Sequence, residues 1–197
     1  MRLPTIYLLR HGQTEWNVEG RYQGHLDSPL TQKGEEQAKN NAHKLKKYLN
    51  ISDVKFFSSP LGRAKSTAEI IAKELGISRE IIIYEEALKE FNYGIFEGET
   101  KRFCQTNLKE EYQAREANKW SYVLENGESY EMVTERLKSW LSTLEGDNQT
   151  IVIIAHEMIN RALRGLYLGL KKAEILTLFQ PNDRLIKLEN GSETILY

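Results

Sequence analysis

The sequence predicts an α/β fold with a mostly parallel central sheet, and two features of the chain indicate it. Short apolar runs rich in strand-forming residues alternate with longer segments whose apolar residues recur at helical spacing. This alternation is typical of parallel strands joined by crossover helices. The length of 197 residues suits one substantial hydrophobic core, so we expect a single domain over residues 1–197.

The first strand and the helix after it are predicted between residues 5 and 49. The apolar run 5–9 (TIYLL) ends at a polar stretch that contains glycine, as at a strand-to-loop junction. Thr31 is the expected N-cap of the following helix, because its hydroxyl can accept a hydrogen bond from a free backbone N–H. This helix is amphipathic, and its apolar positions are Ala38, Ala42, Leu45 and Leu49.

A strand, a helix and another strand are predicted between residues 54 and 84. Residues 54–57 form the strand, Ser59 is the expected N-cap, and Pro60 takes the first helical position. Arg63 then lies in the opening turns of this helix, and residues 81–84 form the third strand. The helix ends at Gly76, and its buried face consists of Ala64, Ala68, Ile71 and Leu75.

The second half of the chain continues the pattern. A helix is expected from Ser129 to Gly146, with an apolar face made of Val133, Leu137, Trp140 and Leu144. Residues 151–155 (IVIIA) are the clearest buried strand, and His156 follows it directly. Two short runs, 185–188 and 194–196, flank Asn190-Gly191, which predicts a hairpin.

The composition excludes several classes of function. A net charge of -1 and a pI near 6.5 provide no broad positive surface for nucleic acid or an anionic membrane, so we expect neither as a partner. The single cysteine excludes an intramolecular disulfide and a zinc site built from several thiolates. The apolar run near the N-terminus is too short for a signal peptide, so we expect a cytoplasmic protein. The sequence carries no signal for an oligomeric state.

Basic side chains follow three of the predicted strands. His11 lies beyond the first strand, Arg63 beyond the second, and His156 beyond the strand 151–155. The carboxyl ends of parallel strands meet at one edge of a sheet, where the ligands of such folds bind. Each of these residues alone is more often structural, and it is their convergence at one edge that indicates a site.

A site of this composition suits phosphoryl transfer. A neutral imidazole is a nucleophile near pH 7, so His11 could attack phosphorus without a separate base. The guanidinium groups of Arg10 and Arg63 can bind phosphoryl oxygens bidentately, and His156 can stabilise the same oxygens. No cluster of metal ligands can be read in the sequence, so we expect neither a metal nor another cofactor.

Several motifs of the chain resemble those of a known family. The segment LLRHGQTEWN at 8–17 is similar to the RHG signature of the histidine phosphatase superfamily, which includes the cofactor-dependent phosphoglycerate mutases. The resemblance continues through blocks that span most of the chain: RYQGHLDSPLTQKGEEQA at 21–38, SSPLGRAKSTAEII at 58–71, LKEFNYGIFEG at 88–98, NGES at 126–129 and IIAHEMINRALRG at 153–165.

The resemblance implies a three-layer α/β/α sandwich with a small cap insertion at about residues 91–126, which covers the substrate. It implies that His11 is phosphorylated and that Glu90 donates a proton to the leaving group, which an alkoxide needs because it leaves poorly. Arg10, Arg63 and His156 would complete a metal-independent phosphate pocket. Two further polar side chains would line this pocket: Asn17 and Gln23.

Glu157 departs from the family pattern, which frequently has glycine after the second histidine. A carboxylate beside a phosphate pocket would repel the substrate, so we expect its side chain to point away.

The segment HEMIN at 156–160 also resembles a zinc-protease motif, but Asn160 replaces the second histidine and this interpretation fails. Three other residues are expected to be structural, at the surface or inert: His25, His43 and Cys104.

Three functions are compatible with these residues. Phosphoglycerate mutases carry a lysine matched here by Lys101, but also a pair of adjacent arginines for the substrate carboxylate, which this sequence lacks. The chain is also shorter than those mutases, so we expect water to reach the phosphorylated enzyme. This favours hydrolysis of a small phosphomonoester over a mutase reaction. A noncatalytic phosphate sensor is the third interpretation, which the presence of both His11 and Glu90 disfavours.

Overall fold

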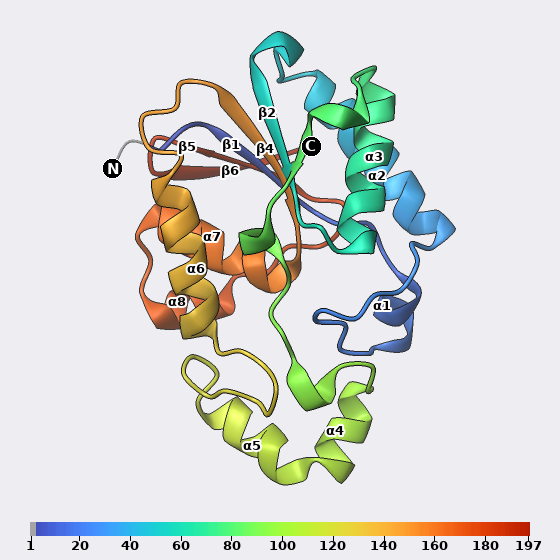
Figure 1. Ribbon diagram of the computed structural model, residues 1–197, viewed down its shortest axis with the longest axis vertical. Coiled ribbons are helices and arrows are strands. Elements are labelled where there is room, and N and C mark those ends of the chain that lie inside the picture. The colour runs from blue at the N-terminus through green and yellow to red at the C-terminus, as the bar shows by residue number, and fades with distance from the viewer. Residues whose placement is uncertain (1–2) are drawn as a thin grey trace.

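The computed structural model describes residues 3–197, and its strands form one sheet. The strands are Ile6–Arg10 (β1), Val54–Ser58 (β2), Ile82–Tyr84 (β3), Thr150–Ala155 (β4), Leu185–Glu189 (β5) and Ser192–Leu196 (β6). Their order is β3-β2-β4-β1-β5-β6, with β4 and β1 at the centre (Figure 1). The pairs β1–β4, β2–β4 and β2–β3 are parallel, whereas β5 runs antiparallel to β1 and to β6. The prediction of a mostly parallel sheet is confirmed.

Helices cover both faces of this sheet. They are Glu15–Glu19 (α1), Gln32–Lys46 (α2), Gly62–Leu75 (α3), Lys101–Asn107 (α4), Lys109–Ala117 (α5), Tyr130–Ser142 (α6), Glu157–Leu168 (α7) and Lys172–Thr177 (α8). The pair α2 and α3 packs on one face and the pair α6 and α7 on the other, which confirms the predicted three-layer sandwich (Figure 1). The helices α4 and α5 lie away from the sheet (Figure 1). No helix within residues 3–197 is long and apolar enough to cross a membrane.

The central strands bury side chains on both faces. Ile6 and Leu8 of β1 belong to the core beneath α6 and α7, whereas Tyr7 and Leu9 belong to the core beneath α2 and α3. Strands buried on both faces read as continuous apolar runs, which is why β1 and β4 could be identified from the sequence. Their register is fixed by the same burial, because a slip by one residue would exchange the two faces.

Two predicted helix ends were wrong. The N-cap of α3 is Leu61 and not Ser59, because the backbone N–H of Ser59 donates to the carbonyl of Ile154 and so continues the strand pairing. The helix α6 ends at Ser142 and not near Gly146, and the residues between them form turns. The predicted N-cap Thr31 is confirmed, and the helix predicted to start near Ser129 has this residue as its N-cap; each side chain accepts a backbone N–H of its helix.

The terminal hairpin is confirmed. Its turn residues Asn190 and Gly191 have φ of 49° and 71°, the left-handed conformations that a tight two-residue hairpin turn requires. The short helix α1 was not predicted. Thr14 and Asn17 form a capping box at its start, but none of its five residues is buried, so no apolar periodicity marks it in the sequence.

Candidate active site

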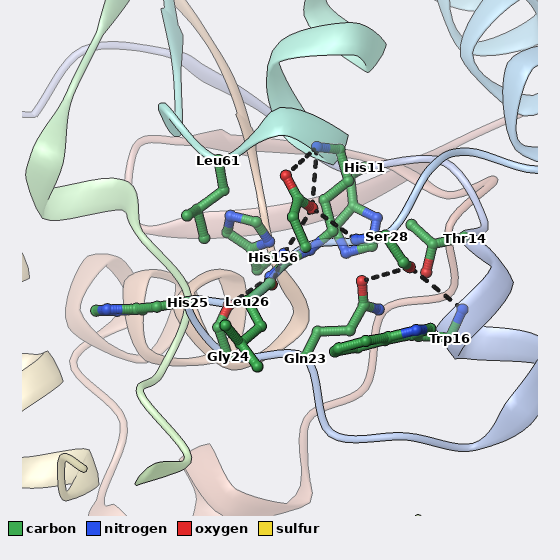
Figure 2. Close-up of polar contacts among 12 residues, drawn as sticks. His11, Thr14, Trp16, Gln23, Gly24, His25, Leu26, Ser28, Leu61 and His156 are labelled. Carbon is green, nitrogen blue, oxygen red and sulfur yellow. Dashed lines mark hydrogen bonds and ion pairs between the residues drawn. The ribbon is translucent and has the colours of Figure 1, made fainter. Parts of the chain in front are cut away.

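His11 and His156 meet at the carboxyl edge of the two central strands. Arg10 is the register partner of Ala155 across the β1–β4 pair, and the next residue of each strand is a histidine. The backbone N–H of His11 donates to the carbonyl of Ala155 at 3.0 Å, which continues the ladder past the strand end. The centroids of the two imidazole rings are 5.2 Å apart, and Figure 2 shows the rings side by side.

The protonation of His11 follows from its surroundings. Its Nδ1 lies 2.7 Å from the carbonyl oxygen of Gly12, and because a carbonyl only accepts, Nδ1 carries the proton. Burial, followed by the charges of Arg63 and Arg10, holds the pKa of His11 well below its usual range. The ring is therefore neutral near pH 7, and its Nε2 has a free lone pair.

Gly12 has a packing reason to be glycine. A Cβ at this position would lie 2.3 Å from the carbonyl oxygen of Gly34 near the start of α2, which is far inside van der Waals contact. The Gly12 N–H donates to the hydroxyl of Thr67 on α3 at 3.0 Å. The loop that orients His11 is thus fixed against two helices.

Arg63 is held with its guanidinium inside the site. Its Nη1 donates to the carbonyl of Leu26 at 2.8 Å and to the carboxylate of Asp27 at 3.0 Å, and its Nη2 donates to the carbonyl of Gly24 at 2.8 Å. The residue is only 2% exposed, so these bonds pair the two terminal nitrogens of a buried cation. Asp27 was not identified from the sequence as a site residue, although it lies in the motif block 21–38.

His156 is completely buried behind this edge. Its Nε2 lies 2.8 Å from the hydroxyl of Ser59, which follows β2. When the Ser59 hydroxyl donates to Nε2, Nδ1 carries the ring proton and is available as a donor. Burial, followed by the charge of Arg63, holds the pKa of His156 well below its usual range.

Three buried nitrogens of this cluster have no hydrogen-bond partner among residues 3–197: Arg10 Nε, Arg63 Nε and His156 Nδ1. Unpaired buried polar groups are costly and therefore rare in native folds. That three of them occur in residues grouped around His11 indicates a site built for an anion with several acceptor oxygens.

Glu90 brings a carboxyl group into the same site. It is 7% exposed, and one of its oxygens accepts the N–H of Phe91 at 2.9 Å. Burial raises the pKa of Glu90, an effect that the Phe91 N–H and the charge of Arg63 partly oppose. A carboxyl group with a raised pKa stays protonated to higher pH, which suits it to donate a proton.

Glu157 does not point away from the site, and the expectation that it would is wrong. Its carboxylate pairs with Arg10 Nη1 at 2.8 Å and with Arg161 Nη2, one helical turn along α7, at 3.1 Å. Arg10 Nη1 also donates to the carbonyl of Gln180 at 3.2 Å. The expected repulsion is offset by two guanidinium groups, and one of them belongs to β1, which no local pattern connects to Glu157.

A cavity of about 100 Å³ opens in front of His11. The predicted residues Asn17 and Gln23 both line it, while His156 lies behind the lining and does not. Asn17 Oδ1 caps α1 by accepting the N–H of Thr14 at 3.1 Å, and Gln23 Oε1 accepts from Ser28, as Figure 2 shows. The other residues that line the cavity are Arg10, His11, Arg21, Tyr22, Gly24, Arg63, Glu90, Tyr93, Glu157 and Met158.

A second cavity of about 290 Å³ shares four lining residues with the first: Arg21, Tyr22, Tyr93 and Met158. It reaches the segment 91–126 through Lys101, Arg115 and Lys119, and α7 through Arg161. Arg115 is 6% exposed and lies over the rings of Phe91 and Tyr93, at 5.5 and 5.3 Å from their centroids. Of the residues that line this cavity, Lys101 was singled out in the sequence, whereas the approach of the others depends on tertiary packing.

The remaining histidines and the cysteine lie outside the catalytic arrangement. His25 donates through Nε2 to the carbonyl of Glu90 at 2.9 Å, and His43 is an exposed side chain paired with Glu74. Cys104 is buried, and burial raises the pKa of its thiol to about 11. No group of three or more histidine, cysteine, aspartate or glutamate side chains within the described range 3–197 could hold a metal ion.

Comparison with known proteins places these features in context. The family model of the histidine phosphatase superfamily, branch 1, matches residues 6–195. An Escherichia coli protein named "Probable phosphoglycerate mutase GpmB" is 35% identical over 192 residues, which cover 95% of this chain and 81% of that protein.

Two solved structures show the same architecture. The alpha-ribazole phosphatase from Shigella flexneri has a TM-score of 0.81 and 26% identity, and the match covers 97% of this chain and 94% of that one. A mycobacterial glucosyl-3-phosphoglycerate phosphatase, solved in complex with VO3, has a TM-score of 0.78 and 26% identity, with 93% and 90% of the two chains covered.

Proposed function

The chain belongs to branch 1 of the histidine phosphatase superfamily, and on this basis we propose that it hydrolyses small phosphomonoesters through a phosphohistidine on His11. The observation that carries the proposal is the neutral His11 ring beside three unpaired buried nitrogens, those of Arg10, Arg63 and His156. A tetrahedral phosphoryl group supplies the acceptor oxygens that these nitrogens lack.

In the first step, His11 Nε2 attacks phosphorus and the bond from phosphorus to the ester oxygen breaks. Protonated Glu90 gives its proton to that oxygen, so the leaving group departs as a neutral alcohol. Arg10 and Arg63 stabilise the charge on the equatorial oxygens, and His156 donates from Nδ1 to the same group. The product of this step is phosphohistidine with Glu90 as a carboxylate.

In the second step, water attacks phosphorus on the side that the alcohol has left. The carboxylate of Glu90 accepts a proton from this water, while the bond from phosphorus to Nε2 breaks and returns its electron pair to the ring. Inorganic phosphate leaves, and both residues regain their starting protonation states. Neither step requires a metal or another cofactor, because side chains of the site supply the nucleophile, the acid and the positive charge.

We propose that residues 91–126 form a cap and that the whole chain is one domain. The second cavity, lined by Arg115, Lys119 and Arg161, lies beside the phosphate cavity and would receive the leaving group. Its volume of about 290 Å³ suits the leaving group of a small metabolite, and its positive charge favours a leaving group that is acidic.

A mutase is the second candidate function, and Lys101 in the wall of the second cavity favours it together with the name of the Escherichia coli relative. Hydrolysis is supported by the absence of adjacent arginines from the sequence and by the phosphatase names of two structural neighbours.

Purified protein should release inorganic phosphate from members of a phosphomonoester panel. Interconversion of phosphoglycerates without phosphate release would favour the mutase, and binding without any turnover would favour a sensor.

Chelators should not inhibit the enzyme, whereas vanadate should. The positive charge that phosphoryl transfer needs comes from Arg10 and Arg63, and vanadate can take the trigonal-bipyramidal shape of the transition state. Phosphate release from an aryl phosphate is measured after dialysis against EDTA and in a vanadate titration. Activity lost to EDTA and restored by zinc or magnesium would contradict the proposed mechanism.

Replacing Glu157 with glutamine should tighten the binding of inorganic phosphate by roughly three- to tenfold. The carboxylate faces the phosphate cavity, so removing its charge reduces repulsion of the anion. The amide oxygen of Glu157→Gln can still accept from Arg10 Nη1, so the arginine keeps its position. The inhibition constant of phosphate is compared in wild type and variant, with Glu131→Gln as an exposed control that pairs with Lys172. Weaker phosphate binding would show that Glu157 acts mainly by holding Arg10.

A further inference from the structure

Glu97, which lies in the same motif block as Glu90, accepts three backbone N–H groups from two separate segments. Its Oε1 accepts from His25 at 2.8 Å and from Tyr93 at 3.0 Å, and its Oε2 accepts from Leu26 at 3.1 Å. A carboxylate is suited to this position because both of its oxygens are acceptors. An amide would present an NH₂ group to at least one N–H donor.

The loop 24–27 that Glu97 binds is the same loop that holds Arg63. The carbonyls of Gly24 and Leu26 accept from the Arg63 guanidinium at 2.8 Å each. Figure 2 shows Gly24, His25 and Leu26 in this loop beside the two active-site histidines. Backbone N–H groups of this loop therefore donate to Glu97, while its backbone carbonyls accept from Arg63.

The same loop also reaches the proposed acid. His25 Nε2 donates to the backbone carbonyl of Glu90 at 2.9 Å, and its own backbone N–H is one of the three that Glu97 binds. Tyr93, which donates to Glu97, lies three residues after Glu90 and lines the phosphate cavity with it. Through residues 24–26, Glu97 is therefore connected by hydrogen bonds both to the Arg63 guanidinium and to the backbone carbonyl of Glu90.

The packing at Gly24 shows how closely Glu97 approaches the loop. Gly24 has φ of 54°, and a Cβ there would lie 1.8 Å from Glu97 Oε1. A side chain at this position would therefore displace the carboxylate, and only glycine adopts this backbone conformation without strain. The close contact between this loop and the Glu97 carboxylate therefore requires glycine at position 24.

We propose that Glu97 is a positioning residue for phosphoryl transfer, which fixes Arg63 and Glu90 in one geometry through the loop 24–27. The inference rests on the proposed function for its catalytic readout, but its binding readout does not. Glu97 acts through Arg63 and is not expected to touch the phosphoryl group. Its loss should therefore weaken phosphate binding only as far as Arg63 contributes to that binding.

A double-mutant cycle with Glu97→Gln and Arg63→Ala tests this. The probe is inorganic phosphate, whose dissociation constant is measured by calorimetry with the full chain, so no turnover is required. Glu97→Gln alone should weaken phosphate binding by about tenfold, and by less than threefold in the Arg63→Ala background. Equal losses in both backgrounds would overturn the proposal. Glu174→Gln, which removes a carboxylate that caps α8 away from the site, should leave the dissociation constant unchanged.

Catalysis gives a second readout and a safeguard against misfolding. Glu97→Gln should lower kcat for an aryl phosphate by about tenfold or more, with thermal unfolding used to verify that the variant is folded. If it does not fold, Glu97→Asp keeps the charge but withdraws the carboxylate by one methylene, and the same cycle with Arg63→Ala applies. A wild type that binds phosphate but hydrolyses no ester would contradict the proposed function, while the binding cycle would still test Glu97.

Discussion

His11→Ala is expected to abolish turnover, with a loss on the order of 10⁴-fold or more in kcat. The variant keeps Arg10 and Arg63, which we propose bind the phosphoryl group, but lacks the imidazole proposed to attack it, and water is a poor substitute. Phosphate release from an alkyl and an aryl phosphate is measured for both proteins. His43→Ala removes an exposed histidine away from the site and should retain full activity. Undiminished activity of His11→Ala would exclude His11 as the nucleophile.

The covalent intermediate provides direct evidence on the same residue. Wild type quenched rapidly during turnover should carry phosphate that is labile in acid and stable in base, as a phosphoramidate is, and peptide mapping should locate it on His11. His11→Ala should carry none. Phosphate that survives acid and maps to a serine would contradict the assignment, whichever way the activity of the variant turned out.

Glu90→Gln should lower the hydrolysis of an alkyl phosphate by roughly a hundredfold or more, and that of a nitrophenyl phosphate much less. An alkoxide is a poor leaving group and needs a proton in the transition state, whereas nitrophenolate is a stable anion. Glutamine preserves the shape of the side chain and can still accept the Phe91 N–H, but it cannot supply the proton. Single-turnover rates with both substrates isolate this role, because equal losses would show that Glu90 only holds the site together.

The pH dependence of Glu90 provides an independent test. Burial raises the folded-state pKa of Glu90, so this carboxyl group stays protonated at pH values where an ordinary glutamate is ionised. It stops acting as an acid only when the pH rises through that raised pKa. For an alkyl phosphate, kcat/KM of wild type should therefore fall on the alkaline side of the profile. Glu90→Gln should lack this alkaline limb. A limb that persists in the variant would have to come from another group.

The parts of the fold that were predictable are those in which local chemistry and tertiary packing agree. The strands β1 and β4 are buried on both faces, so their apolar runs required no knowledge of the surroundings. The positive φ of Asn190 and Gly191 is a property of these residue types, and it identified the hairpin. His11 and His156 were predicted to converge for a similar reason, since each directly follows a buried parallel strand.

The parts that were not predictable depend on partners from distant segments. Ser59-Pro60 satisfies the local rule for a helix start, but the N–H of Ser59 pairs with β4, which no local rule includes. The orientation of Glu157 at the start of α7 is set by Arg10 at the end of β1, so the sequence around Glu157 favoured the wrong outcome. The contacts of Glu97 are with backbone N–H groups, which leave no trace in the identity of the residues that donate them.

The place of β4 in the sheet has a consequence for biosynthesis. β4 lies between β1 and β2, although both are translated long before it. A nascent chain that has not yet reached residue 150 therefore exposes apolar strand edges that only β4 will cover, and is open to wrong pairing or capture by chaperones. The site that brings His11 and His156 together is completed at the same moment as the sheet. An anion that binds this pocket stabilises only chains on which translation has passed β4.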